Sequence, residues 1–288
     1  MAARVPTLIV HGGAGADPAE GREELRAGIC EAVLAGWTAL SAGGTALDAV
    51  ESAVRSLEAH PRFNAGRGAV LNAAGLIELD ASIMEGDRLQ SGAVGAVGRI
   101  AHPVTLARRI LEDGRHVLLV GDGALAFARQ AGLRECDPAE LITERQLSRY
   151  RERGAGTVGA VALDLHGTIA AATSTGGIAG KLPGRVGDSA LIGCGTYAES
   201  TLGGVSCTGD GEPIIRVVLA RRALDILKAM DDPEHAAQVA VDVLVQEGKG
   251  EGGLILLDWR GRVGWAHSTS FMPVGWISPT QPDPVIPF

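Results

Sequence analysis

The dipeptide Gly156-Thr157 has the residue types that a covalent reaction would need. Thr157 opens an apolar run of small and β-branched residues, 157–164, which predicts a strand directly after a glycine-rich loop. Cleavage of the bond after Gly156 would place a hydroxyl and a free α-amine on one residue. An unperturbed α-amine has a pKa of about 7.7–8.0, so near neutral pH it can accept the hydroxyl proton. The pair predicts a self-cleaving precursor with Thr157 as the nucleophile; an ordinary threonine at the start of a buried strand is the alternative.

Three other positions carry polar groups that suit a nucleophile at Thr157. Thr175 ends the next predicted strand, 168–175, so its hydroxyl is expected beside that of Thr157. Thr208-Gly209 lies at a predicted strand-to-helix turn, where a hydroxyl and main-chain N–H groups can stabilise an oxyanion. Asn64 adds a side-chain amide. Taken singly, Thr175 and Thr208 are typical strand residues, and that simpler interpretation is favoured for each.

The loop from Gly184 to Asp188 places a cation, Arg185, three residues before a carboxylate, Asp188. An arginine fork binds a carboxylate through two hydrogen bonds, and an aspartate binds an ammonium group. The pair therefore suits the α-groups of an amino acid, although a surface ion pair would look the same. Together with the hydroxyls, it indicates hydrolysis of an amide on a small amino-acid side chain.

The remaining sequence predicts helices and strands that hold these groups in place. Glycine-rich His11–Gly15 follows a short strand, and its pattern matches no nucleotide-binding motif, so a close backbone approach is expected there. The loop 61–68 is either a long turn or a ring of main-chain carbonyls around a cation. Strands gather near Thr157 and helices lie in pairs towards both ends, which predicts an αββα sandwich. The predicted elements are strands 7–10, 92–97, 117–120 (buried), 157–164, 168–175, 205–208, 253–258 and 263–268, and helices 23–42, 46–57, 104–111, 124–130, 213–230 and 233–246.

Composition excludes several other classes of protein. The chain has 26 basic and 34 acidic residues, and it lacks a basic block, which argues against nucleic-acid binding. The absence of an apolar run of about 20 residues argues against a membrane span. Four cysteines without CxxC spacing, and no signal-peptide pattern, predict a cytoplasmic protein. The seven histidines lie far apart in the sequence without a metal-ligand spacing, which argues against a transition-metal site.

Six segments in order resemble the plant-type asparaginases, also called isoaspartyl peptidases, which are threonine-type N-terminal-nucleophile hydrolases. The segments are His11–Gly15, Phe63–Gly66, Gly156–Val161, Thr173–Gly177, Gly184–Ser189 and Thr208–Glu212. The resemblance implies a four-layer αββα fold and a single domain, 1–288, cleaved into an α chain (1–156) and a β chain (157–288). It also implies an (αβ)2 assembly, and hydrolysis of L-asparagine and β-aspartyl dipeptides through a Thr157 ester.

The resemblance also implies the site residues. Thr157 is similar to the family's nucleophile, and Gly156 to the residue before the cleaved bond. The other catalytic and substrate-binding positions that match are Thr175, Thr208, Gly209, Asn64, Arg185, Asp188 and Gly211. No catalytic cofactor is implied. A structural sodium ion is implied, bound through the main-chain carbonyls of Leu57, Glu58, His60, Phe63, Ala65 and Arg67.

Two features depart from the family pattern. The charged stretch 138–156, interpreted as a linker ahead of the cleavage point, is shorter than usual. Asp210 occupies the variable place in Thr-Gly-x-Gly-Glu, where a neutral or basic residue is expected. A carboxylate there would repel the free carboxylate of a dipeptide leaving group, which predicts a preference for asparagine.

Two alternatives remain for the function. A glycosylasparaginase, acting on N-glycosylated asparagine, would use the same threonine and the same clamp. A non-catalytic amino-acid-binding protein would keep the fold and remain uncleaved.

Overall fold

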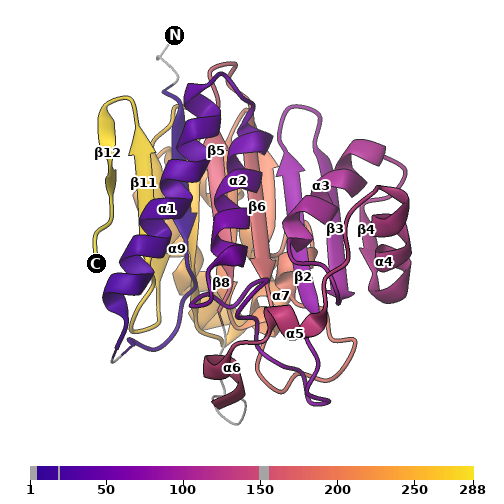
Figure 1. The fold of residues 1–288 in the computed structure, drawn as a ribbon. Helices are drawn as coiled ribbons and strands as arrows, with labels where there is room; N and C mark the ends of the chain where they lie inside the picture. Colours follow the sequence, from indigo (N-terminus) through magenta and orange to yellow (C-terminus); the bar gives the residue numbers. More distant parts are fainter. Residues whose placement is uncertain (1–4, 19, 149–155) are drawn as a thin grey trace.

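The computed structural model describes residues 5–18, 20–148 and 156–288, which form two β-sheets with helices packed on them (Figure 1). The larger sheet has eight strands in the order β12-β11-β1-β5-β6-β2-β3-β4, and the smaller has four in the order β10-β9-β8-β7. The strands are β1 (Thr7–His11), β2 (Leu79–Glu85), β3 (Gln90–Val97), β4 (Leu118–Val120), β5 (Val158–Leu163), β6 (Ile169–Thr175), β7 (Thr196–Glu199), β8 (Gly203–Gly209), β9 (Gly252–Asp258), β10 (Val263–His267), β11 (Val274–Ser278) and β12 (Gln281–Val285).

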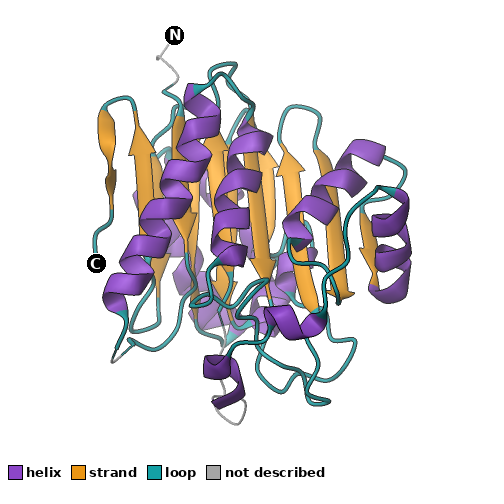
Figure 2. Ribbon diagram, in the orientation of Figure 1, coloured by secondary structure: helices purple, strands orange, loops and turns teal. Residues whose placement is uncertain are grey.

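The helices cover faces of both sheets, as the colouring by secondary structure makes plain for the larger one (Figure 2). The helices are α1 (Arg22–Ser41), α2 (Ala46–Ala59), α3 (Pro103–Asp113), α4 (Gly121–Gln130), α5 (Pro138–Leu141), α6 (Glu144–Ser148), α7 (Gly211–Val217), α8 (Leu219–Met230) and α9 (Pro233–Val243). A 3-10 helix spans Asp188–Ala190, and a π-helical turn, Leu244–Gly248, continues α9.

Alternation along β1 shows how the larger sheet buries both of its faces. Leu8 and Val10 pack with Ile29 of α1 in one core, whereas Ile9 packs with Ile255 of the smaller sheet in another. Successive side chains of a strand point to opposite faces, so one strand serves both cores. The predicted strands 7–10, 157–164 and 168–175 are thereby confirmed as adjacent members of one sheet.

The smaller sheet is covered on its other face by α8 and α9. Leu224 of α8 and Ala237 of α9 pack with Val205 and Leu254 in a separate core. These side chains are small or aliphatic, as the 3 % aromatic content of the chain requires. The structure is thus a mixed α/β fold with two sheets and helical layers.

The predicted helix start at residue 46 is confirmed, and Thr45 is the N-cap residue. Thr45 Oγ1 accepts a hydrogen bond from the N–H of Asp48, and the Asp48 carboxylate accepts one from the N–H of Thr45. This reciprocal capping box satisfies main-chain donors that the first helical turn leaves without partners. It fixes where α2 begins, and α2 in turn leads into the loop that carries Asn64.

Two predictions about elements were wrong. The strand predicted as buried at 117–120 is the edge strand β4, and Val117 and Val120 are about half exposed, because only β3 pairs with it. The single helix predicted for 213–230 is divided into α7 and α8 at Val218, whose φ is 52°. Apolar periodicity continues across this break, so periodicity alone does not reveal it.

The interpreted linker is partly packed rather than wholly solvated. Leu141 of α5 is buried in the core that contains β2 and β3, and the Gln146 side chain donates a hydrogen bond to the carbonyl of Gly68. Residues 149–155, which complete the linker up to the proposed cleavage point, lie outside the described residues.

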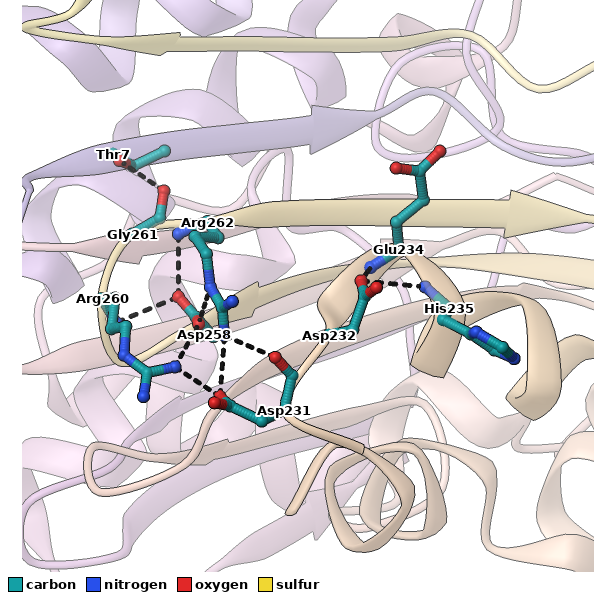
Figure 3. Close-up of polar contacts among 9 residues, drawn as sticks. All are labelled: Thr7, Asp231, Asp232, Glu234, His235, Asp258, Arg260, Gly261 and Arg262. Carbon is teal, nitrogen blue, oxygen red and sulfur yellow. Dashed lines mark hydrogen bonds and ion pairs between the residues drawn. The ribbon is translucent and has the colours of Figure 1, made fainter. Parts of the chain in front are cut away.

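Ion pairs hold the turn between β9 and β10 against the end of α8, and a hydrogen bond joins it to the start of β1 (Figure 3). Arg262 donates to Asp258 at 2.7 Å and to the carboxylate of Asp231 at 2.8 Å. The hydroxyl of Thr7 donates to the carbonyl of Gly261 at 3.1 Å. Both sheets are therefore joined at this end of the molecule.

In the described part of the chain no helix is long and apolar enough to cross a membrane. The four cysteines, Cys30, Cys136, Cys194 and Cys207, are all free thiols.

Candidate active site

The predicted nucleophile lies where the ends of three strands meet. Thr157 immediately precedes β5, is 4 % exposed, and therefore sits beside the end of β1 and the end of β6, because both pair with β5 in antiparallel fashion. The close backbone approach expected for His11–Gly15 is observed. Gly13 has a φ of 106°, and a Cβ added to it would lie 3.1 Å from the main-chain N of Thr157. A side chain at position 13 is thus excluded by both conformation and space.

The carbonyl of Gly156 accepts hydrogen bonds from two of the predicted site residues. Asn64 Nδ2 donates to its oxygen at 2.8 Å, and Thr175 Oγ1 donates at 2.7 Å. The sequence prediction that Asn64 and Thr175 gather at Thr157 therefore agrees with the geometry. Two donors on one carbonyl oxygen stabilise negative charge on that oxygen.

Both donors are held by the turn after β6. Asn64 Nδ2 also donates to the carbonyl of Gly177 at 2.7 Å, and its Oδ1 accepts from the N–H of Val70 at 2.8 Å. Thr175 Oγ1 accepts from the N–H of Gly177 at 2.8 Å. With these bonds both amide hydrogens of Asn64 are used, so the orientation of the amide is fixed.

Thr208 and Gly209 end β8 in the smaller sheet. Thr208 is fully buried, and its Oγ1 accepts a hydrogen bond of 3.0 Å from the N–H of Ala14. Since the hydroxyl accepts there, its own proton remains available for donation. Gly209 has a φ of 137°, and a Cβ on it would lie 2.4 Å from the Cα of Gly252, so only glycine fits.

Arg185 and Asp188, the two residues of the predicted clamp, lie beside each other, and the arginine has a partner that the sequence analysis did not assign. Arg185 donates through Nε and Nη2 to the two carboxylate oxygens of Glu212, each at 2.9 Å. Gly211 lies against this pair, because a Cβ on it would be 2.5 Å from Arg185 Nη2. Glu212 was visible in the segment Thr208–Glu212, but its spacing from Arg185 gives no sign of a contact.

Asp188 is buried beside the arginine with one oxygen left over. It is 4 % exposed, and its Oδ2 has no hydrogen-bond partner among the described residues. Burial raises the pKa of this carboxyl to about 7, against the lowering effect of Arg185. Burying an acceptor without a donor costs free energy of folding. A cationic ligand that donates to Asp188 Oδ2 would offset this cost.

Two carboxylates hold the loop 184–188 in place: Asp80 in β2 and Glu78 just before β2. Asp80 accepts hydrogen bonds from the N–H of Gly187 at 2.9 Å and from that of Ala96 at 2.8 Å. Glu78 accepts from the N–H of Gly184 at 3.0 Å. The sequence shows that these two acidic residues interrupt an otherwise apolar alternation, but it does not show which groups they bind.

Two cavities meet beside Gly156 and Gly209, and Thr157 lines the smaller of them. The smaller, of about 10 Å³, is lined by Thr157, Thr175, Arg185, Asp188 and Gly211 among others. The larger, of about 650 Å³, shares Gly156 and Gly209 with it and opens towards Asp210. The smaller has room for about one water molecule, so no amino acid fits in it in this structure.

The six residues whose carbonyls are expected to bind sodium lie together at the end of α2 and in the loop that follows. The carbonyls of Leu57 and Glu58 already accept hydrogen bonds, from the N–H of His60 at 3.2 Å and of Arg67 at 2.7 Å. Within the described ranges no group of three or more His, Cys, Asp or Glu side chains is placed to hold a metal ion. Any ion at this loop would therefore depend on main-chain oxygens.

Comparison with known proteins shows what this chain is similar to. A family model described as asparaginase matches residues 4–154 and 146–285. An isoaspartyl peptidase/L-asparaginase of Mus musculus is 49 % identical over 285 residues, covering 94 % of this chain and 87 % of its own. One of Danio rerio is 43 % identical over 290 residues, covering 96 % and 93 %. A plant-type L-asparaginase of Pyrococcus abyssi is 40 % identical over 301 residues, covering 96 % and 98 %.

Proposed function

The chain belongs to the asparaginase family, and from this premise we propose that it is a self-cleaving hydrolase of L-asparagine and β-aspartyl dipeptides. Relatives that align with it over almost their whole length are named isoaspartyl peptidase/L-asparaginase. The observation that carries the proposal is the carbonyl of Gly156, which two side-chain donors polarise next to a buried threonine. The family also supports the finer description of the fold as a four-layer αββα sandwich forming one domain, 1–288.

Cleavage is proposed as the first reaction. Thr157 Oγ attacks the carbonyl carbon of Gly156 and loses its proton, while the amide nitrogen of Thr157 gains one and leaves as an amine. Asn64 and Thr175 donate to the carbonyl oxygen, which bears the negative charge of the intermediate. Water then hydrolyses the resulting ester. The products are a chain ending at Gly156 and a chain beginning at Thr157 with a free amine and hydroxyl.

Hydrolysis of asparagine is proposed to repeat this chemistry on a substrate. The α-amine of Thr157 takes the hydroxyl proton while Oγ attacks the side-chain amide carbon, and the amine then returns a proton to the leaving group. Ammonia departs, or the second residue of a β-aspartyl dipeptide. Thr208 and Gly209 stabilise the oxyanion, since the Thr208 proton is available for donation. Water releases L-aspartate from the ester.

The clamp is proposed to select the substrate. Glu212 occupies one edge of the Arg185 guanidinium, and the other edge remains for the substrate α-carboxylate. The partnerless Oδ2 of Asp188 accepts from the α-ammonium, and Gly211 leaves the space between them. Because the intact chain leaves about 10 Å³ at Thr157, removal of the preceding residues is required before asparagine can bind.

No cofactor takes part in this scheme, and a sodium ion is proposed only as a structural ligand. The carbonyls of Leu57, Glu58, His60, Phe63, Ala65 and Arg67 would hold it. The fit is supported at Gly68, where an added Cβ would lie 2.6 Å from the carbonyl oxygen of Pro61 and 2.9 Å from that of Phe63, so carbonyls crowd one side of this loop. Thermal unfolding in sodium against choline chloride tests it.

An (αβ)2 assembly in the cytoplasm is also proposed. The exposed apolar side chains of Val117, Leu118 and Val120 on and beside the edge strand β4 support a second copy there, since such an edge rarely stays open. The four free thiols are compatible with a reducing compartment. Light scattering of the purified protein tests the assembly.

Denaturing gel electrophoresis and ammonia release test the function. Two bands, matching 1–156 and 157–288, are expected for the native sequence, and Thr157→Ala should give one band and no ammonia from asparagine. Thr280→Ala, on an exposed turn, is the matched control. Undiminished ammonia release by Thr157→Ala would overturn the proposal. Assays with a β-aspartyl dipeptide and an N-glycosylated asparagine separate this activity from glycosylasparaginase activity, and a single persistent band would indicate a non-catalytic binder.

A further inference from the structure

Lys181 is a buried lysine next to the substrate clamp, and it has no part in the reactions proposed above. The residue is 6 % exposed, and its Nζ donates a hydrogen bond of 2.9 Å to the main-chain carbonyl of Glu78. An ammonium group has three N–H donors. Among the residues that the structure describes, this is the single hydrogen bond of the ammonium group, and Asp80 and Glu78 act on it only as charges at longer range. Burying a cation with so few direct partners costs free energy of folding.

The turn after β6 fixes where this ammonium group lies. The N–H of Lys181 donates to the carbonyl of Ile178 at 3.0 Å, and its own carbonyl accepts from the N–H of Ala73 at 2.8 Å. The side chain passes close to Gly177, where an added Cβ would lie 3.0 Å from Lys181 Cδ and 3.1 Å from Nζ. The same added atom would lie 3.3 Å from Nη1 of Arg185. The two cationic groups therefore approach one point beside Gly177.

Gly177 also belongs to the wall of the smaller cavity, together with Arg185 and Asp188. Glu212 accepts from Nε and Nη2 of the guanidinium, so Nη1 is the nitrogen that Glu212 leaves to the substrate α-carboxylate. Lys181 lies behind Gly177 rather than in the wall of this cavity. Its effect on a ligand at Nη1 is therefore that of a nearby charge, and glycine at position 177 keeps the separation short.

The charges around Arg185 show why a second cation matters there. Glu212 bonds to the guanidinium, and the carboxyl groups of Asp188 and Asp80 lie close enough for its charge to lower the pKa of each. When all three acids are ionised, one guanidinium faces three carboxylates, and this negative excess repels the α-carboxylate of an amino acid. Lys181 reduces the excess. Burial lowers the pKa of Lys181, and the charge of Asp80 opposes this shift and so favours the charged ammonium form.

We propose that Lys181 is a second cation for the substrate α-carboxylate, acting as a charge beside Arg185 from behind Gly177. It strengthens the binding of ligands that carry an α-carboxylate relative to ligands that lack one, and so determines specificity without touching the reacting amide. This inference rests on the proposed function, because it assigns a further residue to the site where asparagine is proposed to bind.

Kinetics of Lys181→Met with two amides tests the proposal, because methionine keeps the length of the side chain and removes the charge. L-Asparagine carries the α-carboxylate, whereas 3-aminopropanamide has the same ammonium and amide groups with a hydrogen in its place. The variant should lower kcat/KM for asparagine about fivefold to tenfold, mainly through KM, and change kcat/KM for 3-aminopropanamide by less than about twofold. General damage to the site would affect both amides alike, so equal losses would overturn the proposal.

Two further variants separate charge from packing and from the net charge of the protein. Lys181→Arg restores the positive charge but is bulkier than methionine, so it should recover the preference for asparagine over 3-aminopropanamide more fully than Lys181→Met. A better preference with methionine than with arginine would show that Lys181 acts by packing, and would overturn the proposal. Lys228→Met is the matched control, because Lys228 is an exposed lysine in the last turn of α8. An equal loss of preference in this control would also overturn the proposal.

Titration calorimetry of the cleaved proteins gives a readout that needs no turnover. L-Aspartate and β-alanine differ by the same α-carboxylate, so Lys181→Met should raise the Kd for L-aspartate about fivefold to tenfold and leave that for β-alanine within about twofold. Equal weakening of both ligands, or of neither, would overturn the proposal. A native-sequence protein that releases no ammonia from asparagine would refute the proposed function instead, and the comparison of the two Kd values would still decide the role of Lys181.

Discussion

The hydroxyl of Thr175 donates a 2.7 Å hydrogen bond to the carbonyl oxygen of Gly156, the residue directly before Thr157. The intact chain therefore places a catalytic candidate on the bond that the proposed processing breaks. Asn64, in the loop after α2, donates to the same oxygen. One pair of donors thus serves a carbonyl of the protein before any substrate is present.

Replacing Thr175 by valine should slow processing by a factor on the order of 10², because one of two donors to the developing oxyanion is lost. The shape of the side chain is retained, so the fold should remain. The appearance of the 1–156 and 157–288 bands with time on a denaturing gel measures the rate. Thr280→Val, at an exposed turn, provides the control. Processing of Thr175→Val at the native rate would show that its hydroxyl bond to Gly156 is incidental.

Strand pairing explains why so much of this site was predictable. Thr157 and Thr175 lie at the start and end of two strands joined by a short hairpin, so local sequence already brings them together. The segment Gly184–Asp188 holds both clamp residues within one loop. The hydroxyls, Asn64 and the clamp could therefore be proposed from residue types and spacing, with the family resemblance adding Gly211.

Contacts between distant segments were not predictable in this way. Glu212 meets Arg185 across 27 residues, and Asp80 meets Gly187 across 107. His11 meets Ser206 between two different sheets. Each depends on how the sheets stack, and no periodicity in the sequence records that. The exposure of β4 was not predicted because an apolar strand has the same sequence pattern at an edge and in a core. The break at Val218 was not predicted because apolar periodicity continues across it.

The stability of the intact chain should fall as pH rises from about 4 to about 7, by an amount that Asp188 controls. Burial raises its folded-state pKa from 3.8 to about 7, so the folded chain binds a proton in this window that the unfolded chain has released. The free energy of unfolding decreases with pH wherever the folded state binds more protons. The full effect is on the order of 4 kcal/mol.

Urea unfolding of Thr157→Ala between pH 4.5 and 7.5 measures this slope without interference from processing. The double variant that adds Asp188→Asn should lack Asp188's contribution, and the difference between the two cancels other carboxylates. Protonation of the same carboxyl should raise KM for asparagine below about pH 7 in the processed enzyme, because a neutral Asp188 attracts the α-ammonium less. Identical pH slopes of the two variants would exclude Asp188 as the source.

Glu212→Gln should raise KM for asparagine about threefold to tenfold and leave kcat nearly unchanged. The bond pair from Arg185 fixes the plane of the guanidinium, and a neutral amide accepts through only one oxygen. Because the Glu212 side chain is 56 % exposed, solvent screening keeps the effect modest. Steady-state kinetics checks it. Glu247→Gln is the matched control, since Glu247 pairs with Arg222 in the same bidentate manner away from the site. A fall in kcat with constant KM would contradict a role in binding.

Asp210→Thr should raise the kcat/KM for β-aspartyl dipeptides relative to that for asparagine by about threefold to fivefold. Asp210 lines the larger cavity next to Gly209, on the side from which a leaving group would depart, and its Oδ2 accepts from the N–H of Glu251 at 3.0 Å. A carboxylate about 4 Å from the free carboxylate of a dipeptide would cost about 1 kcal/mol in a water-like medium. Asparagine releases uncharged ammonia and meets no such repulsion.

The comparison is strongest with three leaving groups in one assay. A β-aspartyl dipeptide whose second residue is lysine should lose least from Asp210, one with leucine should be intermediate, and one with glutamate should lose most. Asp210→Asn removes the charge and keeps an oxygen that can accept from Glu251, so it separates repulsion from loop geometry. An unchanged ratio of kcat/KM between dipeptide and asparagine in both variants would mean that the carboxylate of Asp210 does not act on the leaving group.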